Sequence, residues 1–148
     1  MPSLAFAKST FGAVVQVSLR PSSRALGAPP PLPVPARPLT LKMLLDTGAQ
    51  DTSVCSSKID PSWGLYPATW YASGTLNGTS LVEVYELALS IHPSSGSVPF
   101  LELDPLNVAS RPGDRFNGLP FHGVIGQDVL NRCRFVYDGL RHQCLLEY

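Results

Sequence analysis

The amino-acid sequence predicts an all-β fold. Its 148 residues include 15 prolines and 12 glycines, whereas only 15% are charged. This composition is typical of short strands joined by many turns. Residues 12–19 (GAVVQVSL) and 81–91 (LVEVYELALSI) are rich in β-branched and alternating apolar side chains, as strands with a buried face are. The chain is long enough to bury a core of its own, so we expect one domain over residues 1–148.

The first expected strands lie on either side of a Pro-rich connection. Residues 12–19 form one strand, residues 20–38 the connection, and residues 39–45 the next strand. We expect the connection to cross the surface in polyproline II form. It contains PxxP patterns at residues 30–33 and 35–38, which fit either a ligand for an SH3-type domain or a stiff spacer. We interpret them as a spacer.

The remaining elements follow from apolar segments and the turn signals between them. Residues 69–91 should form a long hairpin, because Gly74 and Asn77-Gly78 supply residues that tolerate positive φ in a tight turn. The other expectations are a strand at 51–54, a helical or turn segment at 62–65, a strand at 98–103, a loop-rich stretch at 104–122, a helical segment at 128–133, and a terminal hairpin that pairs 134–137 with 143–148 across Asp138-Gly139.

Charge and cysteine usage exclude several classes of function. Lys plus Arg equals Asp plus Glu at 11 each, which argues against a nucleic-acid or membrane partner, and no apolar segment is long enough to span a bilayer. Cys55, Cys133 and Cys144 are odd in number and lack Cys-x-x-Cys spacing, which disfavours a disulfide framework or a zinc site and favours a reducing, cytoplasmic location. The three histidines have no metal-ligand spacing. We interpret Cys55 as a small buried residue rather than a nucleophile.

Asp46 carries the clearest chemical signal. It ends the apolar segment 39–45 and is followed by Thr47 and Gly48, so a buried strand delivers one carboxylate to a tight turn. Burial of an unpaired carboxylate is costly, and such a residue usually shifts its pKa or has a function. Val124-Ile125-Gly126, followed by the expected helical segment, is a second motif. Each motif alone is common as an ordinary turn or strand end, but their order and apolar flanks make a joint functional role the better interpretation.

Together the two motifs resemble those of retropepsin-like aspartic proteases, and the small bacterial-type members more than the viral ones. The resemblance implies a closed β-barrel with a flap hairpin and one short helix after the Val124-Ile125-Gly126 strand. It also implies aspartic endopeptidase activity without a cofactor or metal. Asp46 would be the catalytic residue. Thr47, Gly48 and Ala49 would support the active-site loop, with Thr47 bonding across a two-fold axis to the partner's loop.

The resemblance also assigns substrate contacts and support from the second motif. Substrate would be bound by Gly48, Gln50, Asp51, Gly74 and Thr75, and the loop would be supported by Val124, Ile125, Gly126 and Gln127. Retroviral enzymes typically have an Asp and an Arg, which pair, where this chain has Gln50 and Gln127. A neutral amide pair could replace that ion pair. Ala49 stands where pepsin-like relatives often have Ser, so the carboxylate lacks a hydroxyl donor there.

One Asp-Thr-Gly per chain predicts a homodimer. Hydrolysis by this route needs two carboxylates that share one proton, and no other Asp stands in a setting comparable to that of Asp46. A two-fold axis would bring Asp46 and its symmetry mate together, and we expect residues 143–148 to provide the dimer strand. The partners are then a second copy and a peptide or protein substrate. The alternative is a dimeric peptide-binding or scaffold domain of the same fold that does not cleave.

Overall fold

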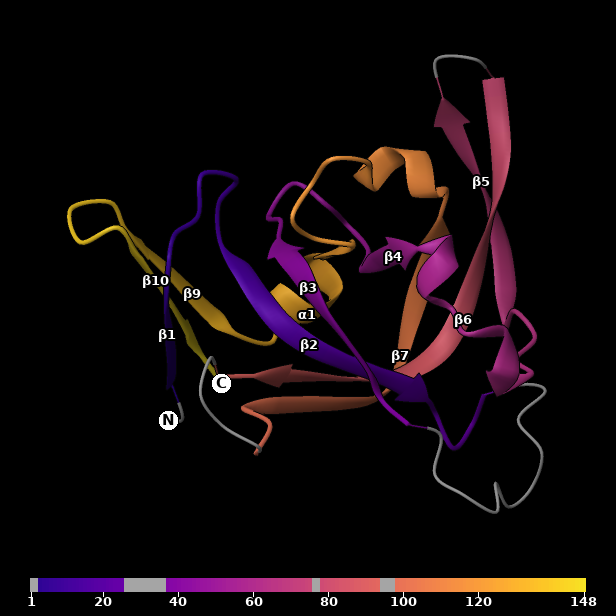
Figure 1. Ribbon diagram of the computed structural model, residues 1–148, viewed down its shortest axis with the longest axis horizontal. Coiled ribbons are helices and arrows are strands. Elements are labelled where there is room, and N and C mark those ends of the chain that lie inside the picture. Colours follow the sequence, from indigo (N-terminus) through magenta and orange to yellow (C-terminus); the bar gives the residue numbers. More distant parts are fainter. Residues whose placement is uncertain (1–2, 26–36, 76–77, 94–97) are drawn as a thin grey trace.

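Residues 3–25, 37–75, 78–93 and 98–148 are described in the computed structural model of the chain. Their strands are β1 (Ser3–Ala7), β2 (Val14–Pro21), β3 (Leu39–Leu45), β4 (Ser53–Cys55), β5 (Thr69–Thr75), β6 (Gly78–His92), β7 (Leu101–Arg111), β8 (Gly123–Ile125), β9 (Arg134–Asp138) and β10 (Gln143–Glu147). Between them lie three 3-10 helices, η1 (Ser56–Lys58), η2 (Pro61–Trp63) and η3 (Gly113–Phe116), and one short helix, α1 (Gln127–Leu130). The predicted all-β fold with one short α-helix is confirmed (Figure 1).

Six strands close into a barrel. They are ordered β2-β3-β8-β4-β7-β6, and an additional pairing between β2 and β6 closes the ring. The β3–β8 and β4–β7 pairs are parallel, and the other pairs in the ring are antiparallel. β5 pairs only with β6 among the described strands, so the two form a hairpin that extends beyond the barrel (Figure 1). The closed barrel expected from the resemblance is confirmed.

The two ends of the described chain pair in a separate three-stranded sheet, ordered β1-β10-β9. All five residues of β1 face partners on β10, from Ser3 opposite Glu147 to Ala7 opposite Gln143. The C-terminal hairpin was predicted, but β1 was not, because two of its five residues are alanines and its pairing depends on a partner at the other end of the chain. β10 is therefore the central strand of this sheet, with β1 on one edge and β9 on the other.

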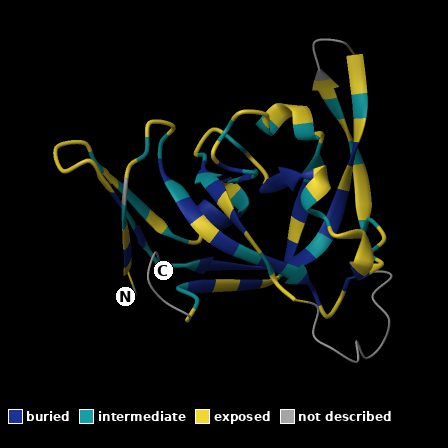
Figure 2. Cartoon of the chain, viewed as in Figure 1, coloured by how far each residue is buried: buried dark blue, intermediate teal, exposed yellow. Residues whose placement is uncertain are grey.

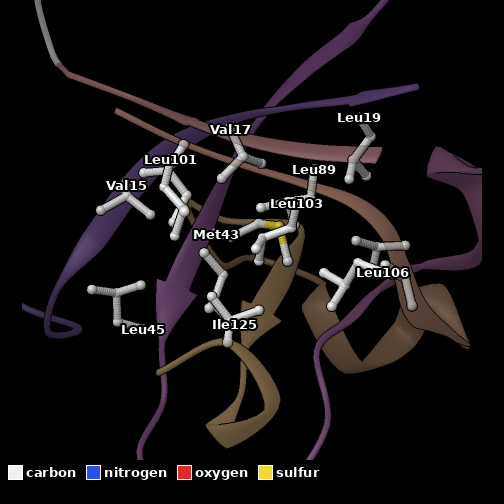
Figure 3. Packing of buried hydrophobic residues seen from close by; sticks show 14 of the residues in the cluster. Val15, Val17, Leu19, Met43, Leu45, Leu89, Leu101, Leu103, Leu106 and Ile125 are labelled. Carbon is white, nitrogen blue, oxygen red and sulfur yellow. The ribbon is translucent and has the colours of Figure 1, made fainter. Parts of the chain in front are cut away.

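Alternating side chains from the barrel strands form the core. Val17, Met43, Leu89 and Ile125 are fully buried, and in Figure 3 their side chains and that of Leu103 point toward a shared centre. In β2 and β3, buried residues alternate with more exposed ones, which matches the period of two along a pleated strand, whereas β6 is buried without interruption from Leu87 to Ile91. Burial is concentrated in the barrel, whereas the outer half of the β5–β6 hairpin is largely exposed (Figure 2).

The main correction concerns β7. The sequence predicted a strand at 98–103 followed by a loop-rich stretch, because Pro105 cannot donate a ladder hydrogen bond. The strand in fact continues to Arg111, and the prediction of a loop was wrong for residues 104–111. The ladder with β6 shifts register between Leu103 and Leu106, and this irregularity accommodates the proline.

Other boundaries differ slightly or cannot be compared. The helical segment expected at 128–133 begins at Gln127 and is α-helical only to Leu130, with turns after it. Most of the Pro-rich connection and its PxxP patterns lie outside the described residues, as does Asn77 of the hairpin turn. No helix in the described part of the chain is long and apolar enough to cross a membrane.

Candidate active site

The barrel places the two sequence motifs side by side. β3 ends at Leu45, which pairs with Ile125 of β8 in a parallel ladder. Asp46 follows, and its backbone N–H donates to the carbonyl oxygen of Ile125 at 3.0 Å. Met43 and Leu45 are buried on the inner face of β3, so the strand is anchored in the core while its next residue, Asp46, is only half-buried. Asp46 is thus the first residue of the loop that follows β3, next to a strand whose inner face is buried in the core.

The Asp46 loop (residues 46–51) begins with a tight turn, which is closed by hydrogen bonds to the side chain and to the backbone of Asp46. The N–H of Gly48 donates to Asp46 Oδ1 at 2.8 Å, and the N–H of Ala49 donates to the Asp46 carbonyl oxygen at 3.2 Å. A Cβ atom at Gly48 would lie 3.2 Å from Asp46 Oδ1, so glycine leaves the carboxylate room. Thr47 is exposed, and its hydroxyl has no hydrogen-bond partner within the described residues. The turn therefore places the Asp46 carboxylate and the exposed Thr47 hydroxyl next to each other.

Gln127 supports this loop through its backbone and its side chain. Its N–H donates to the carbonyl oxygen of Ala49 at 2.9 Å, and its side-chain amide donates to the carbonyl oxygen of Thr47 at 2.8 Å. The N–H of Asp128 donates to the carbonyl oxygen of Gln50 at 3.1 Å. The Gln50–Gln127 amide pair that the sequence suggested is not formed within the described chain, because the Gln127 amide reaches the loop backbone instead.

A buried link between Thr52 and Asp128 was missed by the sequence analysis. Thr52 is fully buried, and its hydroxyl donates to Asp128 Oδ1 at 2.7 Å while its N–H donates to Oδ2 at 3.0 Å. The N–H of Gly126 donates to Thr52 Oγ1 at 3.1 Å. A Cβ atom at Gly126 would lie 2.6 Å from the carbonyl carbon of Asp51, so only glycine fits there. The sequence did contain a signal for this link. Thr52 follows the Asp46 loop and Asp128 follows Val124-Ile125-Gly126, so two side chains that can hydrogen-bond stand next to the two motifs.

A cleft of about 850 Å³ lies between the Asp46 loop and the β5–β6 hairpin. Of the residues predicted for the site, it is lined by Gly48, Ala49, Gln50, Asp51, Gly74 and Val124. The lining residues that were not predicted are Leu44, Ser53, Tyr71, Ala72, Ser73, Arg111, Arg115, Phe116, Leu119 and Phe121. They come from β3, β4, β5, β7 and the segment that contains η3, so distant parts of the chain meet around one groove.

The other predicted residues lie next to the cleft or behind it. Asp46 and Thr47 belong to the loop whose following residues line it. Ile125 is fully buried in the core, and Gly126 is buried behind the loop. Thr75 pairs with Gly78 at the outer end of the β5–β6 ladder. Asp46 and Thr47 therefore belong to the loop beside the cleft, Ile125 and Gly126 to the segment that supports this loop, and Thr75 to the hairpin on the other side.

The cleft contains charges of both signs. Asp51, Arg111 and Arg115 all line it, and Asp51 and Arg115 are exposed whereas Arg111 is half-buried. The Arg111 guanidinium donates to the Tyr71 hydroxyl at 2.6 Å and to Ser73 Oγ at 3.0 Å. It also lies over the Tyr71 ring, 5.4 Å from the ring centroid. Arg111 of β7 is thus held against the inner side of β5.

The cysteines do not form a reactive site. All three are free thiols, and Cys55 and Cys144 are buried. Burial raises the pKa of the Cys133 and Cys144 thiols, which disfavours the reactive thiolate. Among the residues that the structure describes, no group of His, Cys, Asp and Glu side chains is arranged to hold a metal ion.

Comparisons with known proteins identify the fold. No protein-family model matches the chain, and no curated protein matches it significantly. Among solved structures, 14 chains match significantly. One is the crystal structure of a retropepsin-like aspartic protease from Rickettsia conorii, with a TM-score of 0.54 and 15% sequence identity over 99% of this chain and 90% of that chain. At this identity the similarity is one of architecture, and the chain therefore has a retropepsin-like fold.

Proposed function

We propose that the protein is an aspartic endopeptidase whose active site forms between two copies of the chain. The observation that carries this proposal is the hydrogen bond from the Asp46 N–H to Ile125, which joins the two motifs at the edge of the cleft. The retropepsin-like fold supports it, because in that fold the Asp-Thr-Gly loop and the apolar-apolar-Gly strand are neighbours. A peptide or protein in extended form is the substrate that fits a groove between a loop and a hairpin.

The chemistry requires a second acid. One ionised carboxylate accepts a proton from water, and the resulting hydroxide adds to the peptide carbonyl carbon while a protonated carboxylate donates its proton to the carbonyl oxygen. Asp128 cannot serve, because its two oxygens accept hydrogen bonds from the Thr52 hydroxyl, the Thr52 N–H and the Val129 N–H. Asp46 of a second copy supplies the missing group. Two like charges about 3 Å apart cannot both ionise easily, so the pair retains one proton.

The remaining residues take roles around this pair. The exposed Thr47 hydroxyl bonds to the partner's loop and fixes the relative position of the two carboxylates. The Gly48 carbonyl accepts a backbone N–H of the substrate. Gln50 and Asp51 contact the substrate in the cleft, while the β5–β6 hairpin acts as the flap, with Gly74 and Thr75 near its outer end. The assignment is supported by the cleft lining, which includes Gly48, Gln50, Asp51 and Gly74, and by the position of Thr75 at the outer end of the β5–β6 ladder.

We further propose that the β1-β10-β9 sheet belongs to the dimer interface. β10 has a strand on each side, so a partner strand adds at the β1 or β9 edge rather than at β10 itself. The proposal takes residues 1–148 as one protease domain, because Leu4 of β1 and Leu146 of β10 share the core cluster with the barrel. A cytoplasmic location is supported by the three free thiols.

The alternative is a dimeric peptide-binding domain of the same fold without cleavage. Its specific support is the replacement of the Asp and Arg of retroviral enzymes by Gln50 and Gln127. The two functions make opposite predictions for an unstructured protein substrate, which one would hydrolyse and the other would bind intact.

The test is cleavage of an unstructured protein and a peptide library by the wild type and by Asp46→Asn. The amide has the same shape as the carboxyl group but cannot accept or share the proton, so cleavage should fall by at least about a hundredfold. Asp60→Asn is the matched control, since Asp60 is exposed and caps η2, a role that asparagine also fills. Activity of a folded Asp46→Asn protein within a few-fold of wild type would remove Asp46 from the mechanism.

A further inference from the structure

Arg111 differs from the other arginines in its surroundings. Arg20 is also half-buried, but it pairs with Glu102 at 2.7 Å and with Asp104 at 3.2 Å. The half-buried Arg111 has no carboxylate partner in the described part of the chain, and its hydrogen bonds go to two neutral hydroxyl groups. A partly desolvated cation without an anion is costly, which suggests that the anion arrives with a ligand.

The Arg111 guanidinium is held in place by two hydrogen bonds and still has N–H donors that bind no other group in the described chain. Tyr71 and Ser73 are two residues apart on β5, so both side chains lie on the same face of the hairpin, and together they fix the Arg111 fork from one side. A guanidinium has five N–H donors, of which these contacts use two. Arg115, exposed on η3, adds a second cation without an ion-pair partner among the described residues of the same cleft.

We propose that this wall of the cleft, formed by Arg111, Arg115, Tyr71 and Ser73, binds a carboxylate side chain of the substrate, so that the enzyme prefers peptides with Glu or Asp at one subsite. The inference rests on the proposed protease function. Arginine suits this role because its planar fork can hold a carboxylate through two parallel hydrogen bonds, and such charge-assisted bonds are stronger than neutral ones.

Asp51 lines the same cleft as Arg111, so the two side chains act on an acidic group of the substrate with opposite signs. The proposed preference belongs to the subsite at Arg111, and moving one Glu along the peptide locates it. An internal side chain is the expected source of the carboxylate, because the substrate has to pass through the groove on both sides of the scissile bond.

Binding to the Asp46→Asn protein tests the preference without cleavage. The probes are short fluorescent peptides with blocked ends, identical except for one Glu or one Gln moved through each position in turn. At one position, the Glu peptide should bind at least about tenfold more tightly than its Gln counterpart. A further peptide with Gln throughout and a free C-terminal carboxylate distinguishes a terminal carboxylate from a side chain, and tighter binding of that peptide would overturn the assignment to a side chain.

Variants of Arg111 separate charge recognition from support of the hairpin. In the Asp46→Asn background, Arg111→Gln should remove the Glu preference and leave binding of the Gln peptide within about twofold, and Arg111→Lys should retain part of the preference. Arg24→Gln is the control, since Arg24 is exposed and lies outside both the cleft and the β1-β10-β9 sheet, and it should leave the ratio unchanged. An equal loss for both peptides in Arg111→Gln would show a structural role and overturn the proposal.

The same peptides distinguish failure of the inference from failure of the proposed function. A Glu preference in binding, with no cleavage of any peptide by the wild type, would refute the protease and uphold the carboxylate site. Cleavage by the wild type without a Glu preference at any position would refute the carboxylate site alone. No measurable binding of either peptide class would also count against the carboxylate site.

Discussion

Thr52 and Asp128 are joined by two hydrogen bonds although 76 residues separate them in the sequence. The hydroxyl and the N–H of Thr52 each donate to one oxygen of the Asp128 carboxylate, at 2.7 and 3.0 Å. The threonine is fully buried, so both bonds are shielded from competing water. Thr52 immediately precedes β4, and Asp128 lies in α1. The two bonds therefore connect the segment after the Asp46 loop to the helix after β8, and so stabilise the contact between the two motifs.

Replacement of Thr52 by valine should be strongly destabilising. Valine keeps the shape but leaves Asp128 Oδ1 and the Gly126 N–H without the hydroxyl, which costs about 1–3 kcal/mol in the free energy of unfolding. Denaturant unfolding of Thr52→Val and Thr52→Ser measures this cost. The serine variant keeps the hydroxyl, so it should lose less stability than the valine variant. Equal losses would show that the hydroxyl contributes little.

The pH dependence of cleavage should be a bell on the acidic side of neutrality. A pair of acids that shares one proton works only in its singly protonated form, so activity falls at both lower and higher pH. Because Ala49 offers no hydroxyl to the carboxylate, we expect the optimum in weakly rather than strongly acidic solution. Rates across pH, with chelators and thiol reagents as additional conditions, test this. A rise that continues into alkaline solution, or loss of activity with either reagent, would contradict the acid pair.

Tyr85 should make the folded state sensitive to alkaline pH. Burial and a hydrogen bond to Glu83 raise its pKa from 10.0 to about 12. A phenol with a raised pKa in the folded state contributes stability below pH 10 that is lost as the pH rises toward about 12. Over that range the wild type should lose more stability than Tyr85→Phe. Parallel pH curves for the two proteins in urea unfolding would contradict this assignment.

The C-terminal strand should affect association and activity together. Deletion of residues 145–148 removes Leu146, which is fully buried, and most of the ladder that β10 forms with β1 and β9. Sedimentation velocity and cleavage assays should show weaker association and lower activity. The barrel strands remain in this variant, so far-ultraviolet circular dichroism should retain a β spectrum. Undiminished association would place the interface on another surface.

The sequence predicted the parts of the fold whose signals are local. The β3 bounds agree with the expected 39–45 segment, and the alternating 81–91 segment is most of β6, because hydrophobic periodicity alone determines a half-buried strand. β1 and the second half of β7 were missed because part of their pairing depends on distant partners, β10 for the first and β4 for the second. In β7, Pro105 gave a loop signal that the neighbouring strand overrides.

In the candidate site too, the sequence predicted the features that have a local signal and missed those that depend on contacts between distant segments. Asp46 and Val124-Ile125-Gly126 were found because each motif is contiguous, and the structure places them side by side. Arg111 was missed, since nothing in its immediate sequence indicates that it reaches Tyr71, 40 residues away. The Thr52–Asp128 link was missed for the same reason. Contacts between distant segments depend on the barrel closure, which no local pattern encodes.

Mixing wild-type protein with an excess of Asp46→Asn tests most directly whether the active site is shared between two chains. If each chain supplies one acid and subunits exchange freely, a ninefold excess of the variant should reduce activity per wild-type chain to about one tenth, because most wild-type chains then pair with an inactive partner. In a ninefold excess of Asp60→Asn, which is itself active, activity per total chain should equal that of the wild type alone. Activity per wild-type chain that is not reduced by a ninefold excess of Asp46→Asn, with exchange verified by mass spectrometry of differently labelled subunits, would contradict the shared acid pair.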